Sequence, residues 1–181
     1  IQCNATTFDG GLFIASCDKG LPANLMAVGR LNIPAIVVTG GVMEAGPDLL
    51  TLEHMGKYSA QAQRGDITQE QLDYYKQHAC PSCGACSFMG TAGTMQVMSE
   101  ALGPALPGSS LLPATSKALT EYAELAGTQV VKLVEQGICP RDIVTEKSFH
   151  NAILVHAAIS GSTNALLHLP SIAREFGIDL D

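Results

Sequence analysis

The chain has 181 residues and a mass of 18.9 kDa, which suits a single globular domain. Hydrophobic residues make up 46% of the sequence and charged residues only 15%, so disorder and a coiled coil are poor fits. A net charge of −7 with only ten Lys and Arg argues against a nucleic-acid partner. The apolar runs are too short to cross a bilayer, so we expect no membrane partner.

The low charge also suggests that part of the surface packs against a partner or against further polypeptide. The chain opens with Ile1 rather than Met, so we expect an excised piece of a longer protein, without a signal peptide. Six cysteines in a domain of ordinary size favour metal ligation or reduced thiols over a disulfide framework. We therefore expect a cytoplasmic protein.

The first half of the chain alternates strands and helices. Residues 12–15 predict a buried strand, and Pro22 is expected at the first helical position before a helix over residues 23–31. Residues 35–38 predict a second buried strand, and a helix is expected from about residue 50 to residue 64. This alternation predicts an α/β fold, a helix-rich three-layer domain around a short, mostly parallel sheet.

The second half is mostly helical. Thr68 and Gln71 form a capping-box pattern for a helix that runs to about His78. A cysteine-containing loop follows this helix. Further helices are expected at residues 91–102, 116–136, 152–159 and 171–176. Gly127 is a weak point in the helix over residues 116–136.

Cys17, Asp18 and Lys19 follow the first strand and precede a helix, where open α/β sheets bind ligands. Cys17 offers a soft ligand for iron, and Asp18 offers a hard ligand for magnesium. A structural interpretation is also open, in which Cys17 is buried, Asp18 caps the helix and Lys19 forms a surface ion pair.

Cys80, Cys83 and Cys86 form a C-x-x-C-x-x-C run that resembles the start of a ferredoxin motif. A fourth cysteine followed by proline is missing, so an electron-transfer ferredoxin is a weak match. A small iron–sulfur or zinc binding module that uses these three cysteines is a further hypothesis for the function of the chain. A zinc site would recruit Cys17 or His78 as a further ligand. Reduced cysteines packed as small apolar residues are the third possibility.

Residues 90–95 carry small and hydroxyl side chains at an expected helix start, which favours an anion such as a carboxylate, and residues 161–164 have similar side chains. An ordinary helix start explains both segments more simply. The five histidines are isolated in sequence, and we expect each to be a packing or surface residue: His54, His78, His150, His156 and His168.

Four segments together resemble the dihydroxyacid dehydratase and phosphogluconate dehydratase family. They are residues 16–22 (SCDKGLP), 40–43 (GGVM), 84–95 (GACSFMGTAGTM) and 160–165 (SGSTNA). The CPSCGAC context looks most like the sugar-acid branch, which dehydrates aldonates such as xylonate. Family members are much longer, so the resemblance implies a single domain, residues 1–181, from the central part of their N-terminal iron–sulfur and magnesium domain. The implied partners are a sugar-acid substrate, the C-terminal domain of the same protein and further copies in a homo-oligomer.

The resemblance also implies which residues bind cofactors. Cys17 and Cys86 would be two of three ligands of an iron–sulfur cluster, either [2Fe–2S] or [4Fe–4S], with the third ligand upstream. Asp18 and Lys19 would bind Mg²⁺, the lysine being carboxylated on its amine, because an ammonium group cannot ligate a cation. Cys80 and Cys83 would not be cluster ligands.

The implied reaction converts a 2,3-dihydroxy sugar acid into a 2-keto-3-deoxy acid by loss of water. The cluster would act as a Lewis acid beside magnesium. In the family a serine of the C-terminal domain is thought to take the C2 proton. No catalytic residue is therefore expected in this chain, and we expect the 181 residues alone to be inactive.

Overall fold

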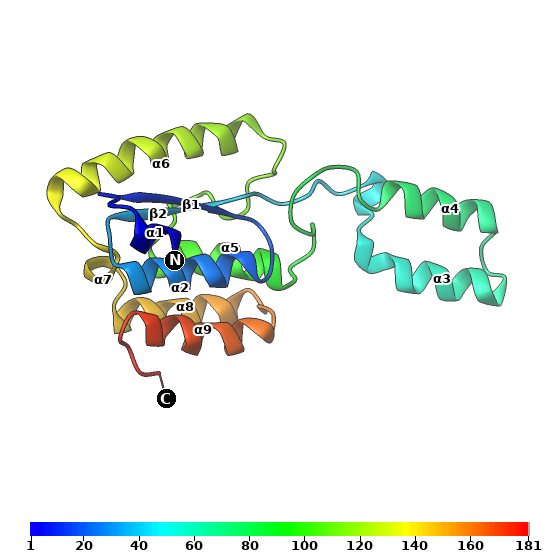
Figure 1. Cartoon of the computed structure of the whole chain (residues 1–181). Coiled ribbons are helices and arrows are strands. Elements are labelled where there is room, and N and C mark those ends of the chain that lie inside the picture. Colours follow the sequence, from blue (N-terminus) through cyan, green and yellow to red (C-terminus); the bar gives the residue numbers. More distant parts are fainter. Residues whose placement is uncertain (181) are drawn as a thin grey trace.

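The computed structural model describes residues 1–180 and confirms an α/β fold with a short parallel sheet (Figure 1). Strand β1 (Gly11–Ala15) pairs in parallel with β2 (Ala35–Thr39), and Phe13 lies opposite Val37. Helix α2 (Gly20–Leu31) connects the two strands, as a parallel pair requires. Each strand is one residue longer than the apolar run that predicts it.

Helices cover both faces of the sheet (Figure 1). Helix α6 (Lys117–Gln136) packs on one face, mainly over β2, while α2 and α5 (Thr91–Leu102) pack on the other. Helices α8 (Glu146–Ala158) and α9 (Asn164–Glu175) lie against α5 and α2 and form a further layer. Two short helices complete this body, α1 (Gln2–Ala5) and α7 (Pro140–Ile143).

The main core lies between these helices and reaches one face of the sheet through Ala35 and Val37 of β2. Leu25 of α2, Met98 of α5, Phe149 of α8 and Ile172 of α9 are all fully buried in one cluster. Burial of such side chains contributes roughly 1.5–3 kcal/mol each. The core thus fixes how α2, α5, α8 and α9 lie relative to one another.

A helical hairpin of α3 (Met55–Arg64) and α4 (Gln69–His78) projects from this body (Figure 1). The helix expected from about residue 50 begins later in the structure, at Met55. Thr51 is extended and its N–H donates to Nδ1 of His54 at 3.1 Å, which closes a separate 3₁₀ turn. A further 3₁₀ turn spans Pro47–Leu49. The capping box that starts α4 is confirmed, with both of its hydrogen bonds present.

The last two helices start earlier than the sequence analysis expects. Helix α8 begins at Glu146 because the Thr145 hydroxyl accepts the N–H of Ser148 at 3.4 Å. Helix α9 begins at Asn164 and continues through Pro170. Proline removes one helical hydrogen bond, but α9 is held by its buried face.

Pro22 lies in the first turn of α2 but not at its first position, since the helix starts at Gly20. Its missing N–H has no helical partner in that turn in any case. Within residues 1–180, none of the helices is both long and apolar enough to pass through a membrane.

Candidate functional site

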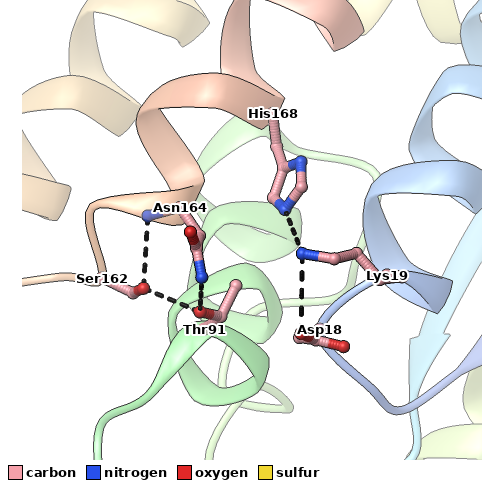
Figure 2. Close-up of polar contacts among 6 residues, drawn as sticks. All are labelled: Asp18, Lys19, Thr91, Ser162, Asn164 and His168. Carbon is pink, nitrogen blue, oxygen red and sulfur yellow. Dashed lines mark hydrogen bonds and ion pairs between the residues drawn. The ribbon is translucent and has the colours of Figure 1, made fainter.

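Three segments that are distant in sequence meet beyond the carboxyl end of β1 (Figure 2). They are the turn between β1 and α2, the first turn of α5, and the start of α9 with the turn before it. The polar side chains drawn there are Asp18, Lys19, Thr91, Ser162, Asn164 and His168. The sheet edge expected to bind ligands is therefore where these side chains gather.

The β1–α2 turn presents Cys17, Asp18 and Lys19 to solvent. The Cys17 residue is exposed, so the interpretation as a buried thiol is wrong. Lys19, not Asp18, is the N-cap of α2, and its side chain makes no capping hydrogen bond. The Lys19 ammonium lies 3.6 Å from Oδ2 of Asp18, with side-chain exposures of 67% and 42%. An exposed ion pair of this kind contributes little to stability, so both side chains are available to a ligand.

His168 lies beside this pair, with Nε2 3.5 Å from Nζ of Lys19 (Figure 2). Partial burial, followed by the positive charge of Lys19, lowers the pKa of His168, although the carboxylate of Asp18 opposes that shift. The imidazole is therefore neutral at neutral pH. His168 is expected to be a packing or surface residue, and it is indeed partly buried; its contact with Lys19 is not indicated by its isolated position in the sequence.

Hydroxyl groups tie the start of α9 to the start of α5. Thr91 Oγ1 lies 2.7 Å from Ser162 Oγ and accepts a hydrogen bond from Nδ2 of Asn164 at 2.9 Å. The N–H of Ser162 donates to Thr94 Oγ1 at 3.0 Å, and its carbonyl accepts from Nε2 of His156 at 2.9 Å. These groups satisfy one another's hydrogen bonds, so they connect the start of α5 to the start of α9 at the site.

Backbone pairing fixes the segment that carries Cys86. The N–H of Met43 donates to the Ala85 carbonyl at 2.6 Å, and the Ala85 N–H donates to the Gly41 carbonyl at 3.0 Å. Gly41 and Met43 belong to the loop that follows β2. Cys86, half-buried and a free thiol, thus lies next to a segment anchored just beyond the end of that strand.

The carboxyl ends of β1 and β2 also lie close to each other. The Gly40 N–H donates to the Ala15 carbonyl at 2.9 Å, and a Cβ at Gly40 would lie only 2.5 Å from Cβ of Ser16. Glycine is therefore needed for this approach. Cys17 follows directly on the end of β1, and Cys86 follows Ala85, which pairs with the loop after β2. Both cysteines lie at the same edge of the sheet.

The other cysteines of the C-x-x-C-x-x-C run are placed differently. Cys80 and Cys83 are exposed free thiols on the loop after α4. His78, which a zinc site would recruit, stacks on Tyr74 with ring centroids 4.1 Å apart and donates from Nδ1 to the Tyr74 carbonyl at 2.7 Å. Nδ1 of the imidazole is thus engaged within α4, so a metal would have to bind at Nε2.

The chemistry of the donors fits two metal groups only in part. The Asp18 carboxylate suits Mg²⁺, and Lys19 would suit it once carboxylated, because the ammonium has no lone pair. Cys17 and Cys86 are free thiols of the kind that bind iron. Among residues 1–180, no three His, Cys, Asp or Glu side chains are grouped closely enough to hold a metal ion. A complete ligand set therefore needs additional groups.

Comparison with known proteins identifies the chain's relatives. The family model described as "Dihydroxy-acid/6-phosphogluconate dehydratase N-terminal" matches residues 1–181. A dihydroxy-acid dehydratase of Syntrophobacter fumaroxidans is 47% identical over 188 residues, covering 100% of this chain and 33% of that protein. Similar proteins of the same name occur in Caldicellulosiruptor saccharolyticus (48% identity, 98% of this chain, 33% of the relative) and Dehalococcoides mccartyi (42%, 99% and 34%).

The relatives confirm the family, but they carry the name of dihydroxy-acid dehydratases and so do not confirm the sugar-acid branch. The chain spans about a third of the length of the curated relatives it matches. The chain belongs to the dihydroxy-acid/6-phosphogluconate dehydratase family, in which it corresponds to the N-terminal region.

Proposed function

We propose that this chain is the metal-binding part of a dehydratase that converts a 2,3-dihydroxy acid into a 2-keto-3-deoxy acid. The observation that carries the proposal is the position of Cys17, Asp18, Lys19 and Cys86 at one edge of the sheet. Dehydration exchanges no electrons with a partner. It needs a Lewis acid for the departing hydroxyl and an acidified C–H bond, rather than a redox carrier.

In this proposal Cys17 and Cys86 hold an iron–sulfur cluster, while Asp18 and carboxylated Lys19 hold Mg²⁺. When bound, the two groups supply the Lewis acidity that departure of the hydroxyl and loss of the C2 proton require. The remaining ligands and the base that takes the proton are supplied by parts of the complete enzyme outside this chain. The chain's own contribution is to hold its four ligands at a rigid sheet edge.

The substrate class follows from the same site and from the relatives' name. A 2,3-dihydroxy acid presents a carboxylate and two hydroxyl oxygens, which are hard ligands for magnesium and iron. The narrower expectation from the sequence is an aldonate such as xylonate. A complete enzyme that dehydrates branched 2,3-dihydroxy acids and leaves aldonates unchanged would remove that narrower expectation.

The competing interpretation is a small iron–sulfur or zinc module built on Cys80, Cys83 and Cys86. The match of residues 1–181 to the dehydratase family model favours the dehydratase. The test is anaerobic purification of the complete protein, with iron, sulfide, zinc and magnesium counts and a keto-acid assay over both substrate types. We expect iron, magnesium and keto acid. One zinc per chain with no keto acid would refute the proposal.

A further inference from the structure

Lys19 and His168 are 149 residues apart in sequence, yet their side-chain nitrogens lie 3.5 Å apart (Figure 2). Helix α9 makes this meeting possible. Asn164 and His168 are four residues apart on α9 and therefore share one face of the helix. The Asn164 side chain is fixed by its hydrogen bond to Thr91 at 2.9 Å. His168 is thus presented to the β1–α2 turn by a helix start that is already anchored.

The opposite ends of the two helices are joined as well. Arg30 at the end of α2 donates from Nε to Glu175 at the end of α9 at 2.9 Å. Helices α2 and α9 therefore run in the same direction, with a polar link near each end and buried side chains between. Since packing sets the position of α9, the contact between His168 and Lys19 follows from the fold and not from a chance surface encounter.

The chemistry of Lys19 determines which way the hydrogen bond runs. A lysine ammonium has three N–H donors and no acceptor, so Nε2 of His168 has to accept. The direction of this hydrogen bond stays the same when Lys19 is carboxylated. The ammonium loses one proton to solvent, the freed electron pair forms a bond to the carbon of CO₂, and a second proton leaves the nitrogen. The product –NH–CO₂⁻ keeps one N–H, which still donates to Nε2.

We propose that His168 is a positioning residue that accepts the remaining N–H of carboxylated Lys19 and thereby directs the new carboxylate group toward the magnesium site. A carbamate is planar at nitrogen, so fixing its N–H also fixes the direction in which the carboxylate leaves the nitrogen. This role rests on the proposed function, because it presupposes that Lys19 is carboxylated. His168 contacts neither substrate nor metal in this role.

The test uses the complete protein prepared with ¹³C-bicarbonate, the carbamate signal in ¹³C NMR and the affinity for Mg²⁺. His168→Leu removes the acceptor, and loss of such an outer partner costs about 10–100-fold in metal affinity. His168→Gln keeps an acceptor oxygen and should retain most of the signal. His150→Leu is the matched control, since His150 is an exposed residue of α8 whose ring lies 3.9 Å from Glu146.

The outcomes separate the two claims. A carbamate signal and Mg²⁺ affinity in His168→Leu equal to those of the wild type would overturn the role of His168 and leave the proposed function standing. A wild-type protein without carbamate and without Mg²⁺ would overturn both.

If His168→Leu does not fold, ¹⁵N NMR of the wild-type imidazole still decides the question. We expect the proton on Nδ1 and a bare Nε2. A proton on Nε2 would overturn the inference.

Discussion

Gly29 sets the distance between α2 and α9, the helices that bring Lys19 to His168. A Cβ at this position would lie 2.6 and 2.7 Å from two ring atoms of Phe176, and 3.2 Å from the backbone of Glu175. Phe176 is buried and meets the ring of Phe149 edge-on, with centroids 6.5 Å apart. Because the ring is buried, Gly29→Ala must displace it or separate the helices at this point.

The size of this effect is best measured against a second glycine. Gly127 lies inside α6, and a Cβ there meets nothing within 4 Å. Alanine gains about 0.5–1 kcal/mol over glycine inside a helix. Both substitutions share this gain, so it cancels in their difference. What remains for Gly29→Ala is overpacking, which costs roughly 1–3 kcal/mol.

Urea unfolding at 25 °C measures the difference directly. We expect Gly127→Ala to unfold at higher urea than the wild type, and Gly29→Ala to be less stable than Gly127→Ala by about 1–3 kcal/mol. If the two alanine variants are equally stable, the close approach of α2 to Phe176 is wrong, and so is the packing of α9 on α2 at this end of the helices.

Three further outcomes are expected. Lys19→Arg keeps the charge but cannot form a carbamate, so magnesium analysis of the complete enzyme should show loss of the metal together with activity, and retained Mg²⁺-dependent activity would exclude Lys19 from the site. Phe149→Ala opens a cavity at a fully buried position and should lower the free energy of unfolding by about 3–5 kcal/mol, whereas a loss below 1 kcal/mol would contradict the core. Burial of Glu100 opposes its ionisation, but backbone N–H donors from Gly108 and Ser110 outweigh burial and lower its pKa from the ordinary 4.5. The wild type should therefore gain stability from this group above pH 4.5 and lose it as the pH falls through the lowered pKa. Glu100→Gln should lack this component of the pH dependence, and unchanged acid unfolding curves would refute it.

The strands and the site edge follow from local pattern. Residues 35–38 are a continuous apolar run, and β2 is buried along its whole length, so its position needed no knowledge of distant contacts. The capping box of Thr68 and Gln71 is equally local and marks α4 correctly. Because parallel strands end at the same edge, the location of Cys17, Asp18 and Lys19 was predictable from sequence as well.

The helices that complete the site were less predictable. Pro170 favours a helix start after it, but packing of Leu169 and Ile172 holds α9 together across the proline. The role of His168 depends on where α9 lies against α2, which side-chain packing at Gly29 and Phe176 determines. A pattern of Asn164 and His168 at four-residue spacing after the SGST turn was the one local signal that would have placed this histidine near the site.

The central claim is that Cys17 and Cys86, but not Cys80 and Cys83 of the cysteine-containing loop, bind the same iron–sulfur cluster. Four serine variants of the complete, anaerobically purified enzyme test it, with visible absorbance and iron content as readouts. We expect Cys17→Ser and Cys86→Ser to abolish the absorbance and most of the iron, while Cys80→Ser and Cys83→Ser keep most of both. Equal loss in all four variants would contradict it.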